Sequence, residues 1–234
     1  MRLATIGFDA DDTLWQNEQF FRFTEGRFLQ LLEAHAEGPV LARRLLDAEV
    51  RNLEFYGFGI KGFVLSMIET ALEVTDGKVD GAAIREILDL GREMLRHPVE
   101  TLPGARTVLE ALHGRYRLVL VTKGDLFDQE RKLAASGLGP FFDAVEIVSD
   151  KRAATYERIF RQNGGEPARA MMIGNSLKSD ILPALEAGAF AVHVPHALTW
   201  EYEHAQVPSD HPRFRAIASL EELPCLIEAV ERGQ

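Results

Sequence analysis

The chain has 234 residues, a formal net charge of -10 at pH 7, 46% hydrophobic residues and 26% charged residues. These values are typical of a globular protein, and the acidic balance argues against binding to nucleic acid or to an anionic membrane, because both would be repelled. A small anionic substrate stays compatible, since local cations or a metal ion can offset the net charge. The single cysteine, Cys225, excludes an internal disulfide.

A reducing cytoplasm fits this cysteine content. The N-terminal residues read as a strand rather than as a basic and then apolar leader, and no apolar run has the length of a membrane span. The sequence therefore predicts a cytoplasmic protein with no membrane partner.

The first predicted element is a short buried strand over residues 4–8, which leads into two carboxylates, Asp9 and Asp11, and a hydroxyl at Thr13. Residues two apart in a strand point to the same side, so the two carboxylates are expected to converge. They would repel each other unless a cation lies between them or one keeps its proton. A Mg²⁺ ion, with one aspartate as nucleophile and the other as general acid, resolves this conflict and favours phosphoryl transfer. The alternative is an aspartate-rich turn after an edge strand.

Within residues 15–96, apolar residues recur at helical spacing in four successive stretches. This pattern predicts an inserted bundle of four helices. The first helix is expected to end at Gly38-Pro39, the second near Gly57 and the third near Gly77. Asp80 is expected to cap the N-terminus of the fourth.

From residue 97 onward the pattern changes to strands alternating with helices, which predicts a parallel sheet with helices on both faces. Residues 1–14 and 97–234 would then form an α/β core domain, interrupted by the helical domain of residues 15–96. Ser219 and Glu222 form a capping box for a C-terminal helix. The later strands are expected at residues 117–121, 144–148, 170–173 and 190–194, and the helices between them at 125–136, 154–162 and 181–187.

Polar groups follow the predicted strands at the edge of the sheet where ligands bind in such folds. Thr122-Lys123-Gly124 offers a hydroxyl, a backbone N–H and a glycine for close approach to an anion near a helix N-terminus. Lys151 follows the third strand, and Asn175 and Asp180 follow the fourth with oxygen donors that suit Mg²⁺. Each residue alone could be a strand end, a solvated lysine or a helix cap, but their common placement favours one site.

Together these segments resemble the haloacid dehalogenase superfamily of phosphatases and related hydrolases. The four matching motifs are Asp9-Ala10-Asp11-Asp12-Thr13, Thr122, Lys151 and Gly174-Asn175-Ser176 through Asp180. The resemblance implies an α/β fold with a three-layer Rossmann-like parallel-sheet core, and residues 15–96 look like the family's first-type helical cap. One departure is Asn175, where many members carry an aspartate.

The resemblance also implies the roles of the residues. Asp9 would attack phosphorus and form an aspartyl-phosphate, Asp11 would act as acid and then base, and Thr122 and Lys151 would hold the phosphoryl oxygens. Mg²⁺ would bind Asp9, the Asp11 carbonyl and Asp180, with Asn175 nearby. In the family the cap closes over the site, and the glycine-rich loop of residues 55–62 is expected either to contact the leaving group or to pack its aromatic residues between helices. The expected substrate contacts are Thr13, Lys123, Gly124, Tyr56, Phe58 and Lys61.

The implied activity is hydrolysis of a small phosphorylated metabolite, with the individual substrate and the oligomeric state left open. A haloacid dehalogenase is the first alternative, but halide leaves without a proton and those members lack the second aspartate that Asp11 supplies here. The second alternative is a catalytically weak binding or regulatory protein on the same fold. Apart from Asn175, the catalytic and metal positions of the motifs keep their functional residue types.

Overall fold

The computed structural model describes residues 1–233, which divide into two compact units. The α/β unit comprises Met1–Glu18, Val99–Lys123 and the chain from Gln129 on, and the helical unit comprises Gln19–Pro98 with the short segment Gly124–Asp128. The sequence assigns that short segment to the core domain, whereas in the structure it groups with the helical unit.

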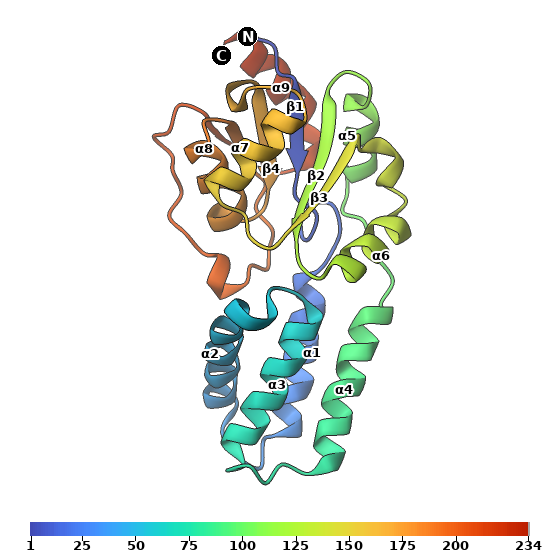
Figure 1. Cartoon of the computed structure of the whole chain (residues 1–234), viewed down its shortest axis with the longest axis vertical. Helices are drawn as coiled ribbons and strands as arrows, with labels where there is room; N and C mark the ends of the chain where they lie inside the picture. The colour runs from blue at the N-terminus through green and yellow to red at the C-terminus, as the bar shows by residue number, and fades with distance from the viewer. Residues whose placement is uncertain (234) are drawn as a thin grey trace. The chain divides into compact units, whose positions relative to one another are not determined.

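The α/β unit contains a parallel sheet in the order β3-β2-β1-β4-β5-β6, with β1 in its interior (Figure 1). The parallel α/β fold predicted from the sequence is confirmed. Five of the strands match predicted ones, whereas β6 was not predicted because three residues are too few to show an alternating pattern. The strands are β1 (Thr5–Phe8), β2 (Arg117–Lys123), β3 (Ala144–Val148), β4 (Ala170–Gly174), β5 (Phe190–His193) and β6 (Phe214–Ala216).

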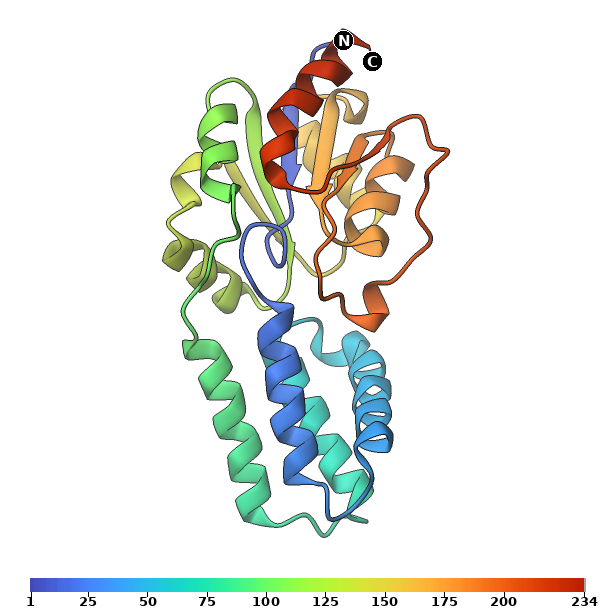
Figure 2. The same cartoon turned by 180° about the vertical axis from the view of Figure 1, so that it is seen from behind.

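Helices cover both faces of the sheet because successive strand residues point to opposite sides. On β2, Leu118 and Leu120 pack into one core with α5 and α9, while Val119 and Val121 pack into the other with α7 and α8. Helix α7 lies in front of the sheet in Figure 1 and α9 in front of it in Figure 2. The helices of this unit are α5 (Ala105–Leu112), α6 (Leu126–Ser136), α7 (Ala153–Gln162), α8 (Leu182–Glu186) and α9 (Leu223–Arg232).

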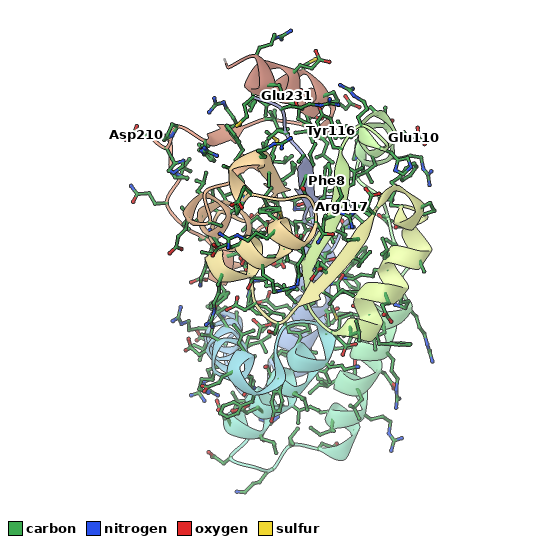
Figure 3. All side chains as sticks on the ribbon, turned by 45° about the horizontal axis from the view of Figure 1, so that its top comes forward. Phe8, Glu110, Tyr116, Arg117, Asp210 and Glu231 are labelled. Atoms are coloured by element: carbon green, nitrogen blue, oxygen red, sulfur yellow. The ribbon has the colours of Figure 1, made fainter. Side chains whose placement is uncertain are left out.

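Glu231, near the end of α9, secures the N-terminal segment that leads into β1. Its carboxylate accepts hydrogen bonds from the Leu3 amide at 2.8 Å and from the Tyr116 hydroxyl at 3.3 Å, and its carbonyl accepts one from the Met1 ammonium at 2.8 Å (Figure 3). The predicted capping box of Ser219 and Glu222 is confirmed at the turn before α9.

The helical unit is built from α1 (Glu18–Leu31), α2 (Gly38–Tyr56), α3 (Ile60–Val74) and α4 (Gly81–Arg96). Gly38-Pro39 begins α2 instead of ending α1, because proline has no N–H to donate and is tolerated in the first helical turn. Asp80 caps α4 as predicted, accepting a hydrogen bond from the Ala82 amide at 3.0 Å. Within residues 1–233, no helix combines the length and the apolar character needed to cross a membrane.

Candidate active site

The candidate site lies where the connections of the sheet change direction. Strand β1 pairs with β2 on one side and with β4 on the other, and ligands in such sheets bind outside the carboxyl ends at this point. Asp9 directly follows β1, Thr122 lies near the end of β2, and Asn175 directly follows β4. The topology therefore brings together residues that are more than 100 positions apart in the sequence.

The centre of the site is an ammonium group between two carboxylates. Lys151 Nζ lies 2.5 Å from Asp9 Oδ1 and 2.7 Å from Asp180 Oδ1. The side chains of Lys151 and Asp180 are each 1% exposed and that of Asp9 is 9% exposed, so the three charges lie almost entirely out of water. The Tyr156 hydroxyl, from α7, donates to the Ser179 carbonyl at 3.0 Å and completes this cluster.

The cluster contains two carboxylates and one ammonium group, so it carries one more negative than positive charge when both carboxylates are ionised. Burial and the charge of Asp180 raise the pKa of Asp9 to about 7, although Lys151 opposes this shift. Burial disfavours the charged form of Lys151, but the two carboxylates outweigh it and raise the pKa of this ammonium above its usual range. Because one cation does not balance the site, a further positive charge would stabilise it.

The loop after β4 is shaped around the Asp180 carboxylate. The Ser176 amide donates to Asp180 Oδ2 at 3.0 Å, within η3, a π-helical turn (Leu177–Ile181) and its N-terminal cap. A Cβ atom on Gly174 would lie 2.2 Å from Asp180 Oδ2, so only glycine leaves room for the carboxylate. Short π-helical segments are frequent at functional sites, and here the turn directs a charged residue back toward β1.

Thr13 joins the first motif to the fourth. Its hydroxyl lies 3.0 Å from Asp9 Oδ2 and 3.3 Å from Asn175 Oδ1, and it accepts a hydrogen bond from the backbone N–H of Asn175 at 3.1 Å. The sequence predicts a substrate contact for Thr13, and in the structure this hydroxyl orients the Asp9 carboxylate.

Asp11 has its own set of partners, which differs from that of Asp9. Its Oδ1 accepts from Lys132 Nζ at 2.6 Å and from Trp15 Nε1 at 2.7 Å, and its Oδ2 accepts from Gln129 Nε2 at 2.8 Å. Burial would raise the pKa of Asp11, but Lys132 and the hydrogen bonds outweigh it and lower the pKa. The two aspartates therefore do not share one cation. Lys151 pairs with Asp9, and Lys132, from α6, pairs with Asp11.

Asp12 has a structural position in the same loop. Its backbone is left-handed, with φ of 59°, and its carboxylate accepts from the backbone amides of Asn17 and Glu18 at about 3 Å. These amides begin α1, where a carboxylate satisfies otherwise unpaired N–H groups. The Asp12 carboxylate is thus used at the start of α1.

The second motif ends β2. Thr122 is buried, with its hydroxyl 3.3 Å from the Lys123 carbonyl. Lys123 is predicted to bind substrate, and in the structure its ammonium group donates to Glu203 Oε1 and to Ser179 Oγ, both at 2.7 Å. Gly124 has a φ of 131°, a conformation that glycine adopts readily and other residues rarely do.

The remaining predicted substrate contacts belong to the helical unit. Tyr56 is exposed at the end of α2, and Phe58 is half-buried in the loop that precedes α3. Lys61 Nζ forms an ion pair with Asp125 Oδ2 at 2.8 Å inside the same unit. An exposed pair of this kind contributes at most about 1 kcal/mol to stability.

Sequence reasoning missed four residues that support the motifs, namely Lys132, Gln129, Trp15 and Glu203. Lys132 and Gln129 lie three positions apart on α6, a spacing that places them on one face of the helix, but nothing in the sequence indicates that this face meets Asp11. The Oε1 atom of Gln129 is buried without a hydrogen-bond partner in the described chain, a feature that costs about 1–3 kcal/mol.

Oxygen donors for a hard cation are present at the Asp9 cluster. The Asp9 and Asp180 carboxylates, the Asn175 amide and the Asp11 carbonyl match the ligands that Mg²⁺ prefers. Within residues 1–233, no three acidic, histidine or cysteine side chains gather as a metal cluster, so neutral oxygens would have to complete this set. Burial and the charge of Asp180 raise the pKa of Asp9, and a divalent cation at these oxygens would favour its ionised form.

Comparison with known proteins places this chain in a family. The model of the family described as haloacid dehalogenase-like hydrolase matches residues 3–188. A crystal structure of a haloacid dehalogenase-like family hydrolase from Xanthomonas campestris is 37% identical, with a TM-score of 0.88, over 99% of this chain and 95% of that one.

Two curated relatives are each 25% identical to the chain. One is the glyceraldehyde 3-phosphate phosphatase of Methanothermobacter thermautotrophicus, aligned over 84% of this chain and 88% of that protein. The other is human N-acylneuraminate-9-phosphatase, aligned over 98% of this chain and 96% of that protein. With the family model covering most of its length, the chain belongs to the haloacid dehalogenase-like hydrolases.

Proposed function

We propose that this hydrolase is a Mg²⁺-dependent phosphatase that acts on a small phosphorylated metabolite through an aspartyl-phosphate intermediate. The observation that carries the proposal is the buried cluster in which Lys151 lies between Asp9 and Asp180. The two curated relatives support it, because both are phosphatases of small molecules. Their substrates differ from each other, so the similarity indicates the phosphate group rather than one metabolite.

In the proposed first step an Asp9 oxygen attacks phosphorus, a P–O bond forms, and the bond to the leaving oxygen breaks. As general acid, Asp11 gives a proton to that oxygen as it leaves. Because Lys132 and its hydrogen bonds hold the pKa of Asp11 low in the structure, this role requires that these contacts loosen and that Asp11 take up a proton when substrate binds. In the second step water attacks the phosphorus of the aspartyl-phosphate, Asp11 takes a proton from the water, and Asp9 is released as a carboxylate. Lys151 and Thr122 hold the non-bridging oxygens, where negative charge develops.

The carboxylate of Asp9 must be ionised to attack, and its surroundings resist ionisation until a cation is bound. Asp9, Asp180, the Asn175 amide and the Asp11 carbonyl would hold Mg²⁺, which supplies charge neutralisation for the carboxylates and the phosphoryl group. Thr13 fixes the orientation of the Asp9 carboxylate through its hydrogen bond to Oδ2. Lys151 provides the permanent part of the positive charge.

The direct test is to trap the intermediate. Purified protein is mixed with Mg²⁺ and p-nitrophenyl phosphate, quenched, and reduced with borohydride, which converts an aspartyl-phosphate to homoserine. We expect peptide mass spectrometry to locate homoserine at position 9. Turnover without conversion of Asp9 to homoserine, or no turnover on any phosphate ester, contradicts the proposal.

Metal binding and protonation of Asp9 should be visible in the stability of the protein. Because the folded pKa of Asp9, about 7, lies above its ordinary value of 3.8, its contribution to stability falls as the pH rises between these two values. We therefore expect Mg²⁺ to raise the unfolding temperature more at pH 8 than at pH 5, measured by scanning calorimetry against EDTA-treated protein. An equal rise at both pH values would contradict this account of the cluster.

Substrate choice is proposed to depend on the loop of the helical unit. Phe58→Ala and Lys61→Ala are expected to lower kcat/KM for the best substrate in a screen of phosphorylated metabolites more than for p-nitrophenyl phosphate, whose activated leaving group needs fewer contacts. Asp125→Asn is the control, since it breaks the same ion pair but keeps Lys61. Equal losses on both substrates would assign the loop a structural role.

A further inference from the structure

The connection between β5 and β6 carries a 3-10 turn, η4 (Glu201–Glu203), that belongs to none of the four motifs. Long connections in compact domains are usually either functional or disordered. This one makes specific contacts with the loop after β4, which carries Asn175 and Asp180. The contacts come from two adjacent residues, Tyr202 and Glu203.

Glu203 is a nearly buried carboxylate, with 13% of its side chain exposed. Its Oε1 accepts from Lys123 Nζ at 2.7 Å, and its Oε2 accepts from the hydroxyls of Ser176 and Ser179, both at 2.5 Å. Burial disfavours its charge, but Lys123 and these hydrogen bonds outweigh burial and lower the pKa of Glu203. The residue is thus ionised and accepts hydrogen bonds through both oxygens.

The partners of Glu203 lead directly to the proposed metal ligands. The Ser176 hydroxyl accepts from the Ser179 amide at 2.9 Å, and the Ser176 amide donates to Asp180 Oδ2 at 3.0 Å. Ser179 is the residue before Asp180, and Lys123 is the residue after Thr122. Through these contacts Glu203 links the end of β2 to the π-helical turn that holds Asp180.

Tyr202 adds a second point of attachment beside the first. Lys178 Nζ donates to the Tyr202 carbonyl at 2.9 Å and lies 3.3 Å from the centre of the Tyr202 ring. Lys178 lies within the π-helical turn between Ser176 and Asp180. Consequently η4 contacts this turn and its N-terminal cap through the hydrogen bonds of two serines to Glu203 and through the cation–aromatic contact of Lys178 with Tyr202.

We propose that Glu203 is a positioning residue that holds the loop from Asn175 to Asp180 in its metal-binding arrangement. The inference rests on the proposed function, because it assigns Glu203 a role toward Mg²⁺ through Asp180. A carboxylate is required at this position, since an amide can replace only one of the two accepting oxygens. Its NH2 group cannot accept from Lys123, and turned the other way it takes away the oxygen to which both serine hydroxyls donate.

The test compares Glu203→Gln with Glu201→Gln, which removes the same charge from an exposed position in the same turn. Isothermal titration with Mg²⁺ measures affinity without turnover. We expect Glu203→Gln to bind Mg²⁺ about 10- to 100-fold more weakly, the usual cost of removing a residue that orients a metal ligand. The Glu201→Gln variant should bind like wild type.

Turnover separates positioning from general damage. With Glu203→Gln, kcat at limiting Mg²⁺ should fall and should recover at saturating Mg²⁺, which a misfolded site would not show. Ser179→Ala removes one hydrogen bond to Glu203 with less risk to folding, and should weaken Mg²⁺ binding in the same direction by a smaller factor. Unchanged Mg²⁺ affinity in both variants overturns the inference.

The outcome for wild type distinguishes this inference from the proposed function. Wild-type protein that neither binds Mg²⁺ nor hydrolyses phosphate esters contradicts the proposed function itself. Wild-type protein that does both, together with a Glu203→Gln variant that matches it, contradicts only the role of Glu203.

Discussion

Asp9→Asn should lower phosphatase turnover by about four to six orders of magnitude, the size of loss that follows removal of a covalent nucleophile. The amide oxygen is a far poorer nucleophile than a carboxylate, and it is also a weaker ligand for Mg²⁺. The measurement is steady-state hydrolysis of p-nitrophenyl phosphate at saturating Mg²⁺, with the borohydride experiment repeated on the variant. No homoserine should form at position 9.

The fold of this variant should survive, so the loss can be assigned to chemistry. An amide at position 9 still accepts a hydrogen bond from Lys151, and it removes the buried charge and the repulsion with Asp180 that together raise the pKa of Asp9. In EDTA at pH 8 the variant should unfold at the same or a higher temperature than wild type. Asp12→Asn is the matched control, because Asp12 is also buried in this loop but contacts backbone amides. Turnover near the wild-type rate in Asp9→Asn would refute the mechanism.

Asp11→Asn should lower turnover by about 10²- to 10⁴-fold, the usual contribution of a general acid and base. The loss in the first step should be smaller for p-nitrophenyl phosphate than for an alkyl phosphate, because p-nitrophenolate leaves readily without a proton. Single-turnover rates of phosphoryl transfer measured on both esters check this expectation. Equal losses on the two esters would exclude Asp11 as the acid.

Asp11→Asn is expected to keep the fold but to lower the free energy of unfolding, because it removes the carboxylate that pairs with the buried Lys132 ammonium. The new amide oxygen can accept from Lys132 and Trp15, as the Asp11 Oδ1 atom does now. The new NH2 group would face Gln129 Nε2, and rotating the Gln129 amide to present its Oε1 atom would give up the hydrogen bond from Nε2 to the Lys123 carbonyl, so the substitution costs about one hydrogen bond, roughly 1 kcal/mol. An unfolding temperature within a few degrees of wild type would support this view, and gross unfolding would make the kinetic result uninformative for Asp11 alone.

Local patterns in the chain were sufficient to predict most of the fold. Apolar strands such as Thr5–Phe8 and Leu118–Val121 are buried on both faces, and this produces the continuous apolar runs that mark parallel strands. The same logic located the strand ends and hence Asp9, Thr122 and Asn175. It missed β6, whose three residues are too few to show an alternating pattern, and it missed α5 although the apolar residues of that helix recur at helical spacing.

By itself, the sequence determined the motif residues, their order and the sheet edge on which they gather, because the carboxyl ends of parallel strands share one edge. The tertiary structure alone decided how their charges are paired. Lys151 lies between Asp9 and Asp180, and Lys132 takes Asp11 as a separate partner. Glu203 reaches Lys123 from 80 positions away. Such pairs depend on which helix face or loop meets the site, and this is set by packing between elements distant in the chain, which no local pattern records.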